Sequence, residues 1–144
     1  MDTVKQVSVF LENRRGSLAA VCRVLGENGI NVLALSIAET DNFGICRFVL
    51  SDTDKGVSVM REAGYTVRVS DVMVISVPDK PCGLSDVLKL LEKEDISVEY
   101  LYSFVKNSGF DALLIFKLSD HPRAAAVLKE NRVKILSQNE VSSL

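Results

Sequence analysis

Apolar and polar positions follow the same order in the two halves of the chain. Apolar residues three or four positions apart predict one stripe of a helix in each half. In the first half this stripe consists of Leu18, Val21, Cys22 and Leu25. In the second half, 66 residues later, it consists of Leu84, Val87, Leu88 and Leu91. Further along, Leu50-Ser51-Asp52 matches Leu118-Ser119-Asp120 at an offset of 68, as a two-residue insertion would produce. The chain is therefore two homologous repeats, which we assign to residues 1–70 and 71–144.

Each repeat predicts the order strand, helix, strand, strand, helix, strand. In the first repeat, strands are expected at residues 7–11, 30–38, 45–50 and 65–69, with helices at 17–28 and 52–63. In the second, strands are expected at 72–77, 96–106, 111–118 and 133–136, with helices at 84–94 and from Pro122 onward. Turns are expected at 41–44 and 107–109. Ser17 is the expected N-cap of the first helix, and residues 137–144 read as a polar, frayed end.

This order of elements predicts the fold. A βαββαβ unit forms a four-stranded antiparallel sheet with both helices on one face, the ferredoxin-like arrangement. The expected fold class is thus α+β: two tandem ferredoxin-like repeats, with antiparallel sheets joined as a pseudo-dimer and helices on one face. A repeat of about 70 residues is marginal alone. No flexible linker separates the halves, because residues 69–72 run nearly from strand to strand.

Composition narrows the function classes. Of the 144 residues 47% are hydrophobic and 25% charged, which is typical of a globular protein. The net charge of −2 and the lack of a long basic run argue against nucleic acid as a partner. No apolar run is long enough to span a membrane, and no secretory signal is visible. The three cysteines lie far apart, so neither a disulfide framework nor a metal site is expected. We expect a cytoplasmic protein without a cofactor.

The sequence predicts no catalytic residues. His121 is the one histidine, and a histidine adjacent to Asp120 in sequence does not form a triad. Cys82 precedes a helix, where a thiol can become reactive, but no neighbouring histidine supports it as a nucleophile. An RNA-binding sheet would carry alternating aromatic residues, as at Tyr100, Tyr102 and Phe104. Their counterparts in the first repeat are small, and the acidic composition makes RNA the weaker interpretation.

Two segments carry a family resemblance. They are Asn13-Arg14-Arg15-Gly16-Ser17-Leu18 and Glu27-Asn28-Gly29-Ile30-Asn31-Val32. They resemble the Pro-Gly-x-Leu turn and the Gly-Ile-Asn-Ile segment of the ACT domain family, although Arg15 stands where the family often has proline. Over residues 3–136 the chain looks like two copies of this domain. The resemblance implies a ligand-sensing module of amino-acid metabolism, with ligands lying between this loop of one domain and the sheet of the adjoining one.

The loop itself favours the same location. A loop that enters a helix presents backbone N–H groups and the positive end of the helix dipole, so a carboxylate fits there. Gly16 permits close approach of the backbone, and the Asn31 amide can both donate and accept hydrogen bonds. The predicted ligand-binding residues are Asn13, Arg14, Arg15, Gly16, Ser17, Leu18, Asn31 and Val32. In the second repeat Ser97 replaces Asn31 and Asp79 adds negative charge, so one site is favoured and two remain open.

These residues also have structural explanations. Gly16 can serve the turn alone, the two arginines can be solvated, Ser17 can be a cap, and Asn31 can occupy a sheet edge or a turn. We therefore predict a non-enzymatic sensor that binds a free amino acid at the repeat interface. It would regulate amino-acid metabolism through a partner enzyme, with a homodimer left open. The alternatives are a protein-interaction module without a small ligand, and an acylphosphatase-like hydrolase that uses Arg14 or Arg15.

Overall fold

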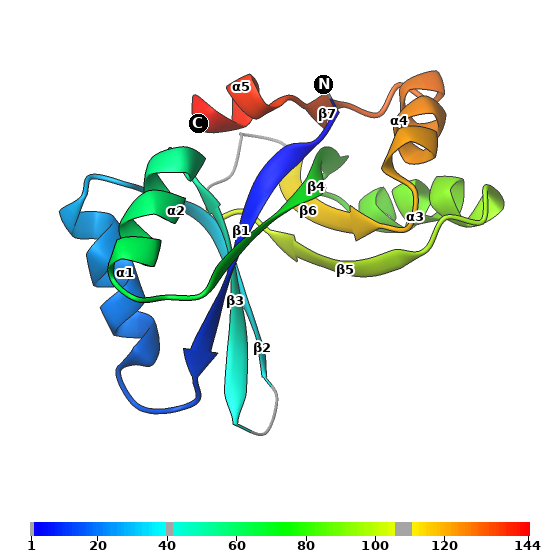
Figure 1. Cartoon of the computed structure of the whole chain (residues 1–144). Helices are drawn as coiled ribbons and strands as arrows, with labels where there is room; N and C mark the ends of the chain where they lie inside the picture. Colours follow the sequence, from blue (N-terminus) through cyan, green and yellow to red (C-terminus); the bar gives the residue numbers. More distant parts are fainter. Residues whose placement is uncertain (1, 40–41, 106–110) are drawn as a thin grey trace. The chain divides into compact units, whose positions relative to one another are not determined.

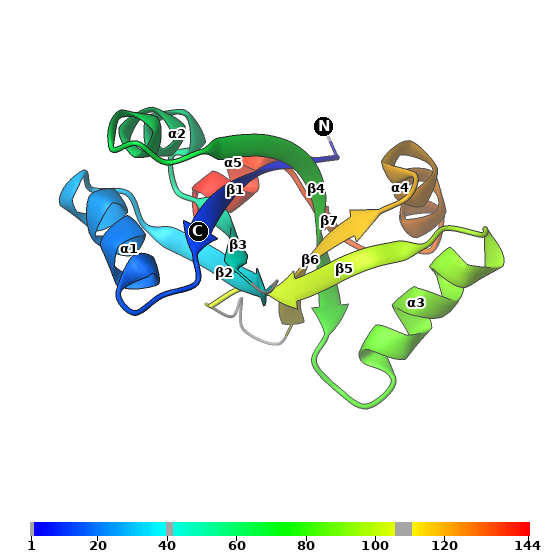
Figure 2. The same cartoon turned by 60° about the horizontal axis from the view of Figure 1, so that its bottom comes forward.

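The computed structural model describes residues 2–39, 42–105 and 111–144. The chain divides into two compact units. The first repeat comprises residues 5–70 with 142–144, and the second comprises residues 71–141 with 2–4. In each repeat two helices lie along one face of a sheet (Figure 1). Figure 2 shows α1 beside α2 on the first sheet, and α3 and α4 along the second.

The first repeat contains four strands and two helices. They are β1 (Val4–Glu12), α1 (Ser17–Glu27), β2 (Val32–Glu39), β3 (Phe43–Leu50), α2 (Thr53–Glu62) and the beginning of β4 (Val67–Pro78). The strand order is β2-β3-β1-β4, and β3 pairs antiparallel with both β1 and β2. The last strand of the repeat therefore lies beside the first, as a βαββαβ unit requires.

The second repeat has the same order. It contains the remainder of β4, then α3 (Gly83–Lys93), β5 (Val98–Ser103), β6 (Asp111–Leu118), α4 (His121–Glu130) and β7 (Ile135–Leu136). β6 pairs antiparallel with β4 and β5, and β7 pairs antiparallel with β4. A short helix, α5 (Gln138–Ser142), follows. The fold class of two ferredoxin-like βαββαβ repeats with antiparallel sheets is confirmed.

The central strand pair of each repeat has an equivalent register. Val7 lies opposite Phe48 in the first repeat, and Met73 lies opposite Phe116 in the second. These positions differ by 66 and 68 residues, the two offsets of the sequence repeat. The two extra residues therefore fall in the β5–β6 connection, where they leave the pairing unchanged. A two-residue insertion within a strand would instead have shifted the register.

Each repeat has its own apolar core between sheet and helices. In the first, Val9, Leu25, Phe48 and Met60 are fully buried together. In the second, Ile75, Leu91, Phe116 and Leu128 are the corresponding residues. Burying a side chain of this size contributes about 1.5–3 kcal/mol. The predicted helix stripes supply Leu25 and Leu91, while the central strands and the second helix of each repeat supply the other residues.

Several predicted boundaries were wrong. The strands expected at 65–69 and 72–77 form one strand, β4, and β5 is shorter than the expected 96–106. Ser17 is not the N-cap of α1. Gly16 occupies that position in the left-handed conformation, with φ of 88°, and Ser17 is already helical. The expected turn at 107–109, and Asp41 of the other turn, lie outside the described residues.

The C-terminal segment is ordered rather than frayed. Ser137 Oγ accepts a hydrogen bond from the Glu140 N–H, and the Glu140 carboxylate accepts one from the Ser137 N–H, both at 3.2 Å. This reciprocal pair is a capping box, which starts α5. Val141, one turn later, is fully buried. The expectation of a frayed end was therefore wrong, because this polar segment forms a helix with one buried apolar residue.

His121 stabilises the start of α4. Its Nε2 accepts a hydrogen bond from the Leu118 N–H at 3.1 Å, which only the neutral imidazole can do. Partial burial, together with the nearby charge of Lys117, lowers the pKa of His121 below its usual 6.5. The histidine therefore has a structural role at the junction of β6 and α4.

Three helix ends differ systematically between the repeats. The first repeat places glycine in the left-handed conformation where the second places a residue with a side chain. The pairs are Gly16 and Cys82, Gly29 and Asp95, and Gly64 and Arg132. A left-handed residue with a Cβ atom costs about 1–2 kcal/mol, a cost that glycine avoids. The second repeat therefore carries backbone strain that the first does not.

We predict that Arg132→Gly stabilises the protein. Arg132 has φ of 61° after α4, and removing its Cβ relieves the strain. Glycine is also more flexible when unfolded, so the net gain in the free energy of unfolding should be about 0.5–1 kcal/mol. Urea denaturation measures it. Arg132→Ala is the matched control, since it removes the same charge but keeps the Cβ atom. Equal stabilisation by both variants would contradict the strain explanation.

We also predict that His121 makes stability fall in mild acid. Its pKa is lower in the folded state, so protonation favours the unfolded state. The contribution is present above about pH 6.5 and is lost as the pH falls toward the folded pKa. Denaturation at about pH 7.5 and about pH 5.5 should show this loss, and His121→Gln should reduce it, because an amide oxygen accepts without titrating. An unchanged loss in the variant would exclude His121 as its source.

Candidate functional site

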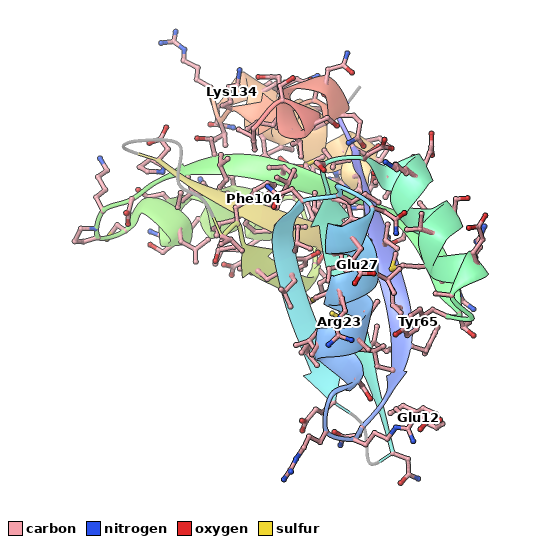
Figure 3. The ribbon with its side chains drawn as sticks, turned by 90° about the vertical axis from the view of Figure 1, so that its left-hand side faces the viewer. Glu12, Arg23, Glu27, Tyr65, Phe104 and Lys134 are labelled. Carbon is pink, nitrogen blue, oxygen red and sulfur yellow. The ribbon has the colours of Figure 1, made fainter. Side chains whose placement is uncertain are left out.

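The first repeat contains an open cleft of about 690 Å³. The end of β1 and the loop into α1 form one wall, and the turn between α2 and β4 forms the other. The two walls come together because β4 lies next to β1, where the Phe10 N–H donates to the Thr66 carbonyl at 3.2 Å. Figure 3 shows Glu12 and Tyr65 on the same side of the ribbon, beside β1. The volume is within the range of small-molecule sites.

Half of the predicted ligand-binding residues line this cleft. Arg14, Arg15, Gly16 and Ser17 form its loop wall. Asn13 and Leu18 flank that wall in sequence. Asn31 and Val32 follow the other end of α1, a helix of 11 residues and so about 16 Å long. In Figure 3 Glu27, at that end of α1, lies away from Glu12. The first repeat therefore does not bring Asn31 and Val32 to the loop.

The surroundings of Asn31 account for its position in the fold. Its backbone N–H donates to Ser51 Oγ at 2.9 Å, and its carbonyl accepts from the Ser51 N–H at 3.0 Å. Ser97 and Ser119 make the same two bonds, at the same distances, in the second repeat. These two hydrogen bonds use the backbone of Asn31 and not its side-chain amide, and the side chain is exposed.

The N-terminus of α1 faces the cleft without a side-chain cap among the described residues. The first turn of the helix contains no acidic residue. By contrast, Asp52 and Asp120 cap α2 and α4 by accepting from the backbone N–H three residues later, at 3.1 Å. The first N–H groups of a helix and its dipole favour an anion. This end of α1 is therefore suited to a carboxylate from outside the chain.

Both signs of charge are present in the cleft. Arg14 Nε lies 3.2 Å from the Glu12 carboxylate, and the two side chains are 75% and 64% exposed. An exposed ion pair of this kind contributes little to stability, typically less than about 1 kcal/mol. It can therefore exchange its partner for a ligand at small cost. Arg15 adds a second cation to the same wall.

The backbone of Glu12 also points toward the cleft. In an antiparallel strand, successive N–H groups point to opposite sides. The Asn13 N–H donates to the Asn42 carbonyl at 3.2 Å, on the side of β3. The Phe10 N–H points the other way, toward Thr66, and the Glu12 N–H, two residues later, shares its direction. A donor therefore stands beside the cationic loop.

The second repeat has a cleft at the equivalent place, with a volume of about 430 Å³. Pro78 replaces Glu12 there and has no N–H to donate. Gly83 replaces Ser17, and a Cβ atom at Gly83 would clash with the Pro78 carbonyl oxygen, so helix and strand approach closely there. Asp86 replaces Ala20 and puts an acidic residue into the first turn of α3. These three changes disfavour a carboxylate.

Sequence reasoning missed Glu12 and Tyr65 as cleft residues. Only the predicted strand order could have indicated them, because it places the last strand of a repeat beside the first. Both residues adjoin that contact, at the end of β1 and just before β4. Pairing between strands more than 50 residues apart brings them together. A local pattern does not reveal such a neighbour.

Other chemistry has little support in the described residues. No group of three or more potential metal ligands occurs among them. The imidazole of His121 is occupied by the Leu118 N–H. Cys82 is exposed at the start of α3, and neither Cys82 nor His121 lines the second cleft. None of the helices in the described ranges is both long and apolar enough to cross a bilayer.

Comparisons with known proteins agree with this architecture. A family model described as an ACT domain pair matches residues 2–144. A crystal structure of a protein from Bacteroides thetaiotaomicron is 37% identical, with a TM-score of 0.92, over 99% of this chain and 97% of that one. The regulatory subunit of aspartate kinase from Thermus thermophilus is 13% identical, with a TM-score of 0.67, over 90% and 93% of the two chains. That likeness shows the fold alone. No protein with curated annotation matched.

Proposed function

This chain belongs to the ACT domain pair family, and on that premise we propose that it binds a free amino acid in the cleft of its first repeat. The family is one of regulatory, ligand-binding modules. The proposed protein is non-enzymatic, and its signal passes to a partner enzyme of amino-acid metabolism. The proposed site uses residues of the first repeat only.

The observation that carries the proposal is the pairing of opposite charges at an uncapped helix end. A free amino acid has a carboxylate and an ammonium group on one carbon atom. The N-terminus of α1, Arg15 and the Glu12 N–H suit the carboxylate. The Glu12 carboxylate, held by an exposed and exchangeable pair with Arg14, suits the ammonium. The cleft therefore offers complementary groups to both ends of the zwitterion.

The proposal places one amino-acid site in each chain. The second cleft lacks the strand-edge donor, because Pro78 stands in place of Glu12. It also contains Asp86 in the first turn of α3, where a negative charge competes with an incoming carboxylate for the helix N-terminus. Asp86 thus disfavours a carboxylate at the N-terminus of α3, whereas no acidic residue occupies the first turn of α1.

Thermal-shift and calorimetric titrations with the standard amino acids test the proposal. A ligand at 100 times its dissociation constant adds about 2.7 kcal/mol to the free energy of unfolding, which is readily measured in a protein of this size. We expect one chemical group of amino acids to bind with one site per chain. A flat panel in both methods would contradict the proposal and favour a protein-interaction module.

Variants then locate the ligand. Glu12→Gln and Arg15→Gln should each weaken binding about tenfold or more, since each removes a charge-assisted hydrogen bond worth about 1.5–3 kcal/mol. Lys80→Gln is the matched control, because Lys80 replaces Arg14 in the second cleft. It should leave the affinity unchanged. Loss with Lys80→Gln, and none with the first two, would move the site to the second repeat.

Asn31→Ala tests the extent of the site. If the cleft of the first repeat alone holds the ligand, this variant should bind as the parent does, because Asn31 lies beyond the far end of α1. A loss of about 1–3 kcal/mol, the cost of an unpaired polar group, would instead bring Asn31 into the site. Size-exclusion chromatography of the same samples, with and without ligand, shows whether the chain forms the homodimer that the sequence leaves open.

A further inference from the structure

Aromatic side chains gather around the cleft of the first repeat. Phe10, Phe43 and Tyr65 all line it. The equivalent positions of the second repeat are Ser76, Asp111 and Val133, which line the second cleft. The same backbone positions are thus all aromatic in one cleft and all non-aromatic in the other. A general preference of strands for aromatic residues would apply to both repeats and does not explain this difference.

Two of these rings are unusually exposed. Phe43 is 54% exposed and Phe10 is 39% exposed, although phenylalanine is usually among the buried residue types. Exposed apolar surface that gathers at a cleft is typical of a binding site. Tyr65 is half-buried on the opposite wall and packs against the core of the first repeat. An apolar ligand group in this place would remove ring surface from water.

The strand register puts the rings beside the proposed ammonium site. Phe43 lies directly opposite Glu12, and Phe10 lies two residues before Glu12 on the same face of β1. Directly opposite residues have Cβ atoms about 4.5–5.5 Å apart, and alternate residues of one strand are about 7 Å apart, so both distances are within reach of aromatic side chains. The Glu12 carboxylate therefore stands next to both rings. A ligand held there by its ammonium group has its side chain within reach of them.

Building on the proposed function, we propose that the bound amino acid has an aromatic side chain: phenylalanine, tyrosine or tryptophan. Offset or edge-to-face contacts between rings contribute beyond the burial of apolar area, so an aromatic ligand gains more here than an aliphatic one. An acidic side chain would lose hydration against the rings and would face their negative π-surfaces. The volume of about 690 Å³ accommodates the largest of the three.

Calorimetric titration of the full chain with single amino acids tests this inference. L-phenylalanine, L-tyrosine and L-tryptophan should bind at least about fivefold more tightly than L-leucine, and far more tightly than L-alanine, L-aspartate or L-lysine. This ranking needs no variant and so does not depend on how a variant folds. Tightest binding of a small, aliphatic or charged amino acid would overturn the aromatic assignment and leave the proposed function intact.

Phe43→Leu provides the matched measurement, because leucine keeps apolar bulk and removes the ring. It should weaken L-phenylalanine binding about two- to tenfold and change L-leucine binding less. Ile37→Ala is the control, since Ile37 is a comparably exposed apolar residue of the same repeat that does not line the cleft. Equal losses for both ligands, or a loss with Ile37→Ala, would overturn the ring contact. No binding by any amino acid would overturn the proposed function as well.

Discussion

In each repeat the central strand pair is held in a single register, with Val7 opposite Phe48 and Met73 opposite Phe116. A slip by one residue would turn every side chain of a strand to the other face and place Ser8 in the core. Burial of these phenylalanines therefore sets the strand register, and the register in turn positions the residues of the cleft. The same register places Phe43 opposite Glu12 and directs the Glu12 N–H away from β3.

Local pattern was enough to predict the repeats and the fold class. The residues of a helix stripe, such as Leu18 to Leu25, all belong to one element, so their spacing is visible in the sequence. The prediction was wrong where the backbone conformation of a single residue determines the helix boundary. Gly16 takes the left-handed turn itself, which moves Ser17 from the cap into the helix. The capping box of Ser137 and Glu140 was readable, but polar composition led us to interpret the segment as frayed.

The candidate site was predictable only in part, because it depends on contacts between distant segments. Arg14 to Ser17 were predicted from the loop and from the family resemblance, and they line the cleft. Glu12 and Tyr65 enter through the neighbouring positions of β1 and β4, a long-range relation with no local signature. Asn31 was predicted to bind the ligand through its side-chain amide. In the structure its backbone N–H donates a hydrogen bond to a serine hydroxyl, in the same way as the N–H of Ser97. The role of the Asn31 side chain in ligand binding stays a prediction.

The left-handed helix ends give the two repeats different conformational freedom. Strained ends at Cys82, Asp95 and Arg132 are places where local opening requires less free energy, so the second repeat should fluctuate more there. At the first cleft the corresponding ends are Gly16 and Gly64, which adopt these conformations without strain. The loop into α1 therefore reaches its conformation without stored strain. A ligand that binds there does not have to offset such strain, and more of the contact energy remains as affinity.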